Sequence, residues 1–275
     1  MRQTTGSMIC PECGKLIGVG EEKCPFCGAW RPGLYGWTPV VQRLFGQRLD
    51  LIAIIVMGCV GLFIASLVLQ PEAILQMNGL FSILSPGQRA LYQLGMTGGV
   101  AWREGWWWTV LTAIYLHGGL LHIFFNVMWI RSLGPQVEEV YGPARAFVIF
   151  SVAGATGFVL SDVVSGSPSI GASGSIFGLL AALIVYGRKR GGSMMTMQLW
   201  QWAAVMFAMG FFMGGVNNWA HAGGFAGGWV TAQAMRFSEK RESRGVQLLA
   251  LALLALTGAG VVLSFIKVTS LLLIR

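Results

Sequence analysis

Long uncharged runs of apolar residues recur along the chain and are separated by short polar or basic stretches. A helix of about 20 apolar residues spans the ~30 Å hydrocarbon core of a bilayer. The clearest run of this length is Leu51–Leu69, and a shorter one begins at Ser173. Together the runs predict seven transmembrane helices, near residues 51–69, 117–133, 146–163, 173–186, 194–213, 219–235 and 246–266. We therefore expect an all-α polytopic membrane protein.

The composition agrees with this pattern. Of the 275 residues, 55% are hydrophobic and 11% are charged, whereas about 25% of the residues of an average soluble domain are charged. The first 50 residues differ from the rest, because they are polar and rich in Cys, Gly and Pro. They do not resemble a secretory signal peptide, so we expect the first span to act as its own insertion signal.

The positions of Lys and Arg predict how the helices are oriented, because cytoplasmic loops carry an excess of these residues. With the amino terminus inside, six fall in the leader, two in the second connection, three in the fourth and four in the sixth. Only Arg89, Arg103, Lys267 and Arg275 fall outside. We expect a multi-pass protein of a bacterial cell (inner) membrane, with its carboxyl terminus extracytoplasmic. The net charge of +8 then serves contact with anionic lipid and requires no nucleic acid.

The leader contains two Cys-x-x-Cys pairs, Cys10 with Cys13 and Cys24 with Cys27, and a glycine follows each pair. Four thiolates at this spacing can surround one Zn²⁺ tetrahedrally, which leaves no position open for catalytic water. Iron and two disulfides are the alternatives, although a cytoplasmic location disfavours disulfides. We expect a structural zinc unit over residues 1–35, followed by a linker over 36–50. The fifth cysteine, Cys59, is expected to pack within the first span.

About 46 residues, from Gln70 to Tyr115, separate the first two predicted spans. A loop of this length is usually either functional or disordered. Four tryptophans in it, one of them in the pair Trp102-Arg103, favour a position in the outer headgroup region.

Three polar residues open the second predicted span: His117, His122 and Asn126. His122 and Asn126 are four positions apart and therefore share one face of a helix. Both can donate hydrogen bonds to a single acceptor, such as an oxyanion. Alternatively, they satisfy the backbone or each other. The three histidines of the chain, with His221, all lie at the same predicted outer level.

Ser173 stands at the start of the fourth span, where free backbone N–H groups stabilise negative charge. Gly174 and Gly178 lie four positions apart and give one face of the fourth span only small residues. Gly224 and Gly228 do the same on the sixth span, and such faces allow two helices to approach closely. Such an approach would bring Ser173 to His221. Alternatively, the serine only packs and the histidine binds haem or a metal, although no carboxylate or thiol accompanies the histidines at this level.

A third member of a catalytic triad is not evident. Asp162 lies near the outer end of the third span, but nothing in the sequence places it beside His221. A Ser–His dyad is therefore the better hypothesis. Phe177, one helical turn after Ser173, can supply an apolar contact that orients the imidazole.

Over about residues 48–237 the chain resembles the rhomboid family of intramembrane serine proteases. The resemblance rests on four strings in the expected order: Trp102-Arg103, His117-x4-His122-x3-Asn126, Gly171-Ala172-Ser173-Gly174 and Ala220-His221-x2-Gly224-x3-Gly228. It implies a six-helix catalytic core over residues 51–237. Residues 238–275 would then add a basic linker and a seventh transmembrane helix.

The resemblance also implies roles for individual residues. Ser173 would be the nucleophile and His221 the general base, while His122, Asn126 and the backbone N–H of Ser173 would form the oxyanion hole. Glu138 is similar to a structural glutamate of the family, although the Gly-Pro before it differs from the usual small pair. The remaining residues of the four strings and Phe177 would have supporting roles.

The resemblance implies that the substrate is a transmembrane segment of another protein, cut near its outer end. The long first loop and the fifth span would be candidate gates. A non-catalytic member of the family that binds or escorts membrane proteins is the alternative. A transporter is a more distant one, which would predict acidic residues within the spans. The zinc unit either docks a cytoplasmic partner or only stabilises the amino terminus.

Overall fold

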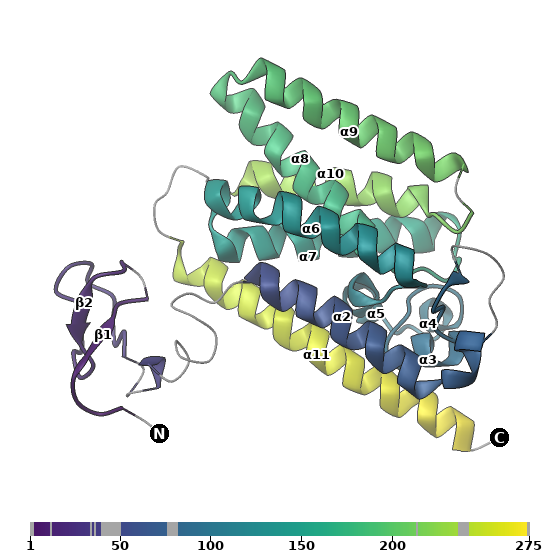
Figure 1. Cartoon of the computed structure of the whole chain (residues 1–275), viewed down its shortest axis with the longest axis horizontal. Coiled ribbons are helices and arrows are strands. Elements are labelled where there is room, and N and C mark those ends of the chain that lie inside the picture. Colours follow the sequence, from purple (N-terminus) through teal and green to yellow (C-terminus); the bar gives the residue numbers. More distant parts are fainter. Residues whose placement is uncertain are drawn as a thin grey trace. The chain divides into compact units, whose positions relative to one another are not determined.

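The computed structural model describes residues 3–11, 13–33, 35, 37–39, 51–75, 82–212, 214–235 and 242–273. The chain divides into two compact units, Met1–Leu51 and Ile52–Arg275, which are drawn in Figure 1. Most of the predicted linker, from residue 40 to residue 50, and the basic residues from 236 to 241 lie outside the described residues.

The first unit is built around a short antiparallel hairpin of β1 (Ser7–Ile9) and β2 (Leu16–Gly18), with Met8 opposite Ile17. Its buried core contains Met8, Ile17 and Val19 together with Cys10 and Cys24. A core of this size buries little apolar surface, and domains below about 40 residues usually need a metal or disulfides.

The second unit is helical. Its described helices have these bounds: α2 Leu51–Leu69, α3 Gln88–Gln93, α4 Val100–Arg103, α5 Thr109–Thr112, α6 Leu120–Tyr141, α7 Pro143–Val164, α8 Ser173–Arg190, α9 Ser193–Phe212, α10 Asn218–Ala234 and α11 Arg244–Leu273. Two 3-10 turns, η2 Pro71–Leu75 and η4 Ala113–Tyr115, complete the set. The long first loop is therefore largely structured, and it contains α3, α4 and α5.

Each of the seven predicted spans corresponds to a helix, and α2 has the predicted bounds. The second span is different, because α6 begins at Leu120, so His117 precedes the helix instead of opening it. The same helix continues past Gly134 and Pro135 to Tyr141. Proline disfavours helix in the preceding residue partly through a clash with its Cβ. Gly134 has no Cβ, which removes that clash.

Three helices are individually long and apolar enough to cross a membrane: Leu51–Leu69, Pro143–Val164 and Arg244–Leu271. A fourth candidate is the pair Thr109–Tyr115 and Leu120–Tyr141, which is bent by 95°. The other three predicted spans, α8, α9 and α10, do not meet this criterion by themselves. A helix that is covered by protein needs less apolar surface, and α8 is buried along most of its length. The chain is a multi-pass membrane protein.

The centre of the bundle is formed by α10, which packs most extensively against α7 and α8. Glycines make this packing possible. A Cβ placed on Gly224 would overlap the carbonyl of Gly174, and one on Gly228 would overlap the backbone of Gly178. The backbones of α8 and α10 therefore touch, and this contact brings together the two helices that carry Ser173 and His221.

Candidate functional site

Ser173 and His221 are hydrogen-bonded, with 2.8 Å between Ser173 Oγ and His221 Nε2. Ser173 is the first residue of α8, and His221 lies in the first turn of α10. The imidazole is buried, with 6% of the residue exposed. The structure thus joins two residues that are 48 positions apart in the sequence.

Phe177 orients the His221 ring. Its ring stacks on the imidazole with centroids 4.5 Å apart and an angle of 23° between the planes. Nδ1 of His221 is buried and has no hydrogen-bond partner among the described residues. Because Nε2 faces the serine hydroxyl, Nδ1 is assigned the proton of the neutral ring. Asp162 instead accepts a hydrogen bond from Thr97 Oγ1, at 2.8 Å. The arrangement is a dyad.

Asn217 fixes the start of α10 and was not singled out from the sequence. Its side-chain oxygen accepts from Ala220 N at 3.1 Å, which is the geometry of a helix N-cap. Its Nδ2 donates to Ser161 Oγ and, at 2.7 Å, to Ser169 Oγ. Asn217 therefore links the ends of α7 and α10 to the segment that leads into Ser173. An asparagine just before a helical run is the signal that would have revealed it.

His122 lies beside the segment that leads into Ser173. Its Nδ1 accepts a hydrogen bond from Gly118 N at 3.2 Å, so Nε2 is assigned the proton of the neutral ring. A Cβ on Gly171 would lie 2.7 Å from this Nε2. Gly171 also has a φ of +121°, a conformation that L side chains rarely adopt. Only glycine satisfies both constraints, which explains its place two residues before the serine.

Asn126 is buried one turn further along α6. Its Nδ2 donates to the His122 carbonyl at 2.7 Å, and one hydrogen of this amide nitrogen remains for another acceptor. The backbone N–H of Ser173 is in the first turn of α8, where intrahelical acceptors are missing. His122, Asn126 and Ser173 thus each retain an N–H donor.

His117 contacts His122. Its Nδ1 is 3.2 Å from the carbonyl oxygen of Tyr115, and its ring meets that of His122 edge to face with centroids 5.0 Å apart. The residue is fully buried. It supports the position of the His122 ring.

Three other predicted site residues lie apart from the dyad. Trp102 and Arg103 form the end of the short helix α4, and both are exposed. Glu138 follows His122 by about four and a half turns of α6, which corresponds to roughly 24 Å along the axis. The structure gives these residues no contact with Ser173 or His221.

The four leader cysteines form a separate cluster. Their sulfur atoms all lie within 4.8 Å of one another, with Cys10 Sγ 3.8 Å from Cys27 Sγ and Cys13 Sγ 3.7 Å from Cys24 Sγ. A tetrahedral zinc site with Zn–S bonds of ~2.3 Å has S···S edges of ~3.8 Å. The cluster therefore fits a tetrahedral metal ion.

Two thiols of this cluster, those of Cys24 and Cys27, differ in pKa. Burial raises the pKa of Cys24, but hydrogen bonds from the backbone of Phe26 and Cys27 and from the neighbouring thiols outweigh it and lower that pKa to about 7. Burial raises the pKa of Cys27 to about 12. A cation that binds all four sulfurs must therefore displace a proton from Cys27.

Comparison with known proteins finds matches to rhomboid proteins. Residues 104–237 match the family model for the rhomboid domain. The chain is 36% identical over 162 residues to rhomboid protease GluP of Bacillus subtilis, a match that covers 54% of this chain and 31% of that protein. It is 29% identical over 144 residues to putative rhomboid protease YdcA of the same organism, covering 50% and 69%. It is 28% identical over 156 residues to inactive RHOMBOID-like protein 8 of Arabidopsis thaliana, covering 52% and 42%.

The matched region contains both residues of the dyad and both side chains of the expected oxyanion hole. The chain spans about a third of the length of GluP and about half of the length of several plant relatives. Residues 104–237 of the chain therefore form a rhomboid domain.

Proposed function

We propose that this chain is an intramembrane serine endopeptidase that cleaves transmembrane segments of other proteins. The observation that carries the proposal is the 2.8 Å hydrogen bond between Ser173 and His221 inside a helical membrane domain. A buried imidazole next to a serine hydroxyl is the arrangement that activates a serine as a nucleophile. The names of rhomboid protease GluP and putative rhomboid protease YdcA support the same activity.

The reaction begins when Ser173 Oγ attacks the carbonyl carbon of a peptide bond while His221 Nε2 takes the hydroxyl proton. The tetrahedral intermediate collapses when the C–N bond breaks, and His221 returns the proton to the leaving amine. Water, activated by His221 in the same way, then attacks the acyl ester. This step releases the second product and restores the Ser173 hydroxyl.

The oxyanion of each tetrahedral intermediate would be held by the N–H donors of His122, Asn126 and Ser173. The tautomer of His122 supports this role, because its bond from Gly118 leaves Nε2–H as a donor. Each such donor contributes roughly 10²–10³ in rate.

The charge distribution supports an orientation in which the dyad lies toward the outer face. α8 starts at Ser173 and ends in the basic residues Arg188, Lys189 and Arg190. Basic residues favour the cytoplasmic side, so Ser173 would lie at the opposite, outer end of the helix. A substrate would then be cut near its outer end, where small or helix-breaking residues expose the peptide bond.

The experiment is cleavage of a transmembrane reporter by the purified protein in liposomes. Ser173→Ala and His221→Ala should each abolish cleavage. Ser175→Ala is the matched control, because the Ser175 hydroxyl is buried two residues away and bonds to no described residue. A protein that binds the reporter without cutting it would instead support the non-catalytic alternative. Cleavage that survives Ser173→Ala would refute the nucleophile.

We also propose that the leader cluster holds one structural Zn²⁺ through Cys10, Cys13, Cys24 and Cys27. The sulfur separations support tetrahedral coordination. The ion would stabilise the small first unit and would supply no part of the cleavage chemistry. Metal analysis should find about one zinc per chain. Cys24→Ser should remove it, whereas Cys59→Ala, a change at a buried cysteine of α2, should retain it.

A further inference from the structure

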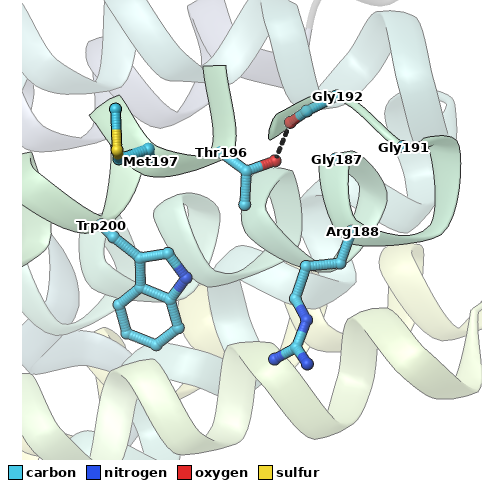
Figure 2. Close-up of a pocket in the computed structure, with 7 residues that line it drawn as sticks. All are labelled: Gly187, Arg188, Gly191, Gly192, Thr196, Met197 and Trp200. Atoms are coloured by element: carbon cyan, nitrogen blue, oxygen red, sulfur yellow. Dashed lines mark hydrogen bonds between the residues drawn. The ribbon is translucent and has the colours of Figure 1, made fainter. Parts of the chain in front are cut away.

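A pocket of about 460 Å³ lies between the end of α8 and the start of α9. Figure 2 shows the residues that line it, which are Gly187, Arg188, Gly191, Gly192, Thr196, Met197 and Trp200. Ser173 begins α8 and Arg188 lies in its last turn, so the pocket is at the far end of the helix from the dyad. It is therefore a separate site.

Two hydrogen-bond donors flank the pocket. In Figure 2 the side chains of Arg188 and Trp200 extend in the same direction, and the indole nitrogen of Trp200 faces the gap between them. Within the described part of the chain, Arg188 pairs with no carboxylate, and its guanidinium lies 5.6 Å from the ring centroid of Trp229. The Trp200 indole donates to no described residue. Both groups are available to an acceptor that carries negative charge.

The wall beside these donors is apolar and aromatic. The ring of Trp200 lies 5.3 Å from that of Phe225 and 6.1 Å from that of Trp229, measured between centroids. Met197, one turn before Trp200 on the exposed side of α9, is 58% exposed. A site with a cation on one side and exposed aromatic surface on the other suits an amphiphile better than a small ion.

The opposite side of the pocket offers little competing polarity. The Thr196 hydroxyl already donates to the carbonyl of Gly192, as the dashed line in Figure 2 marks. The three glycines have no side chains to fill the space. The room next to Arg188 is therefore open to a group of the size of a lipid headgroup.

We infer that this pocket binds the phosphate-bearing headgroup of an anionic phospholipid. The phosphodiester would accept from the Arg188 guanidinium and the Trp200 indole, and an acyl chain would lie along the exposed face of Trp200 and Met197. The pocket is at the basic end of a helix in a membrane bundle, where headgroups of one leaflet are present. The inference does not depend on the proposed proteolysis.

The test is native mass spectrometry of the full chain with phosphatidylglycerol, phosphatidylcholine or inorganic phosphate as probe. The wild type should retain phosphatidylglycerol in preference to phosphatidylcholine. Arg188→Gln should lower the retained fraction about fivefold, the effect of one basic contact near a membrane surface. Arg190→Gln is the matched control and should retain the lipid, because the Arg190 guanidinium lies over the Tyr186 ring instead.

Two further arms keep the result interpretable. Arg188→Lys retains the charge without the planar guanidinium and should bind with intermediate strength, which separates lost recognition from lost folding. Inorganic phosphate should not displace the lipid at equal concentration. Equal retention by the wild type and Arg188→Gln would overturn the inference. Displacement by inorganic phosphate would assign the pocket to a soluble anion and would also overturn it.

Discussion

The two outer helices α9 and α11 are held by different kinds of contact, although both are long and mostly apolar. They lie at opposite edges of the bundle in the view of Figure 1. α11 packs against α3, α5 and α7 and is joined to the first loop by hydrogen bonds. Trp108 Nε1 donates to Ser264 Oγ at 2.9 Å, and Gln93 Nε2 donates to Thr269 Oγ1 at 3.2 Å.

α9 is held by apolar rings. Trp202 meets Trp129 of α6 at 5.6 Å between centroids, and Phe207 meets Phe177 of α8 at 6.4 Å. Among the described residues, the side-chain hydrogen bond that this helix makes is the local one from Thr196 to the Gly192 carbonyl. Ring contacts can shift without leaving a polar group unsatisfied. A shift of α11, by contrast, would break its side-chain hydrogen bonds to the first loop and leave their donors without acceptors.

For the proposed protease, this difference favours α9 over the first loop as the element that would admit a substrate. The loop carries α3 and α5, and α11 secures both of them. α9 instead touches Phe177, the residue that stacks on His221. A displacement of α9 would therefore open a path next to the dyad and leave the loop in place.

The largest expected effect comes from fixing α9. A reducible bifunctional thiol reagent that joins Trp129→Cys to Trp202→Cys should lower reporter cleavage at least about tenfold, because a fixed α9 would keep the path next to Ser173 and His221 closed. Reduction of the linker should restore it. A matched link between Trp108→Cys and Ser264→Cys should leave most activity intact. Equal inhibition by both links would remove the distinction between the two helices.

Displacing α11 should have the next largest effect. A Cβ on Gly260 would lie 2.9 Å from Thr112 Cγ2 and 3.1 Å from Trp108 Cδ1. Gly260→Leu should therefore lower the free energy of unfolding by about 1–3 kcal/mol through overpacking. Gly258→Leu is the control, since a Cβ there meets nothing within 4 Å. Thermal unfolding in detergent measures both, and equal transition temperatures would contradict the packing argument.

Removing one hydrogen bond of α11 should have a smaller effect. Ser264→Ala takes away the acceptor of the Trp108 indole, and we expect a loss of about 1 kcal/mol. Denaturation of the purified protein measures this change. Trp108→Phe in the same background should cost little more if the two side chains act as a pair, and full additivity would argue against the bond.

Substitution of an exposed polar residue of α9 should have the smallest effect on the free energy of unfolding. Gln201 is exposed and bonds to no described residue, so Gln201→Leu should change the free energy of unfolding by less than about 0.5 kcal/mol. The same denaturation assay applies. A loss as large as that of Ser264→Ala would mean that α9 has polar anchoring of its own.

The helices and the approach of Ser173 to His221 were predictable because their signals are local or chemically distinctive. The bounds of α2 follow from one uncharged run, and the imidazole of His221 stands out in an apolar span. The anchoring of α11 was not predictable, because the Trp108–Ser264 bond joins residues 156 positions apart and neither has a distinctive pattern around it. The continuation of α6 past Pro135 was missed because Gly-Pro usually ends a helix.

Nδ1 of His221, which has no hydrogen-bond partner among the described residues, has a consequence for the electrostatics of the membrane interior. A triad carboxylate beside it would place a permanent ion among apolar helices, where an uncompensated charge is expensive. The resting pair of hydroxyl and neutral imidazole carries no net charge. In the proposed reaction a positive ring exists only while an acyl group is transferred, and the face of Phe177 lies next to it. The bundle therefore need not solvate a permanent charge at the proposed catalytic centre.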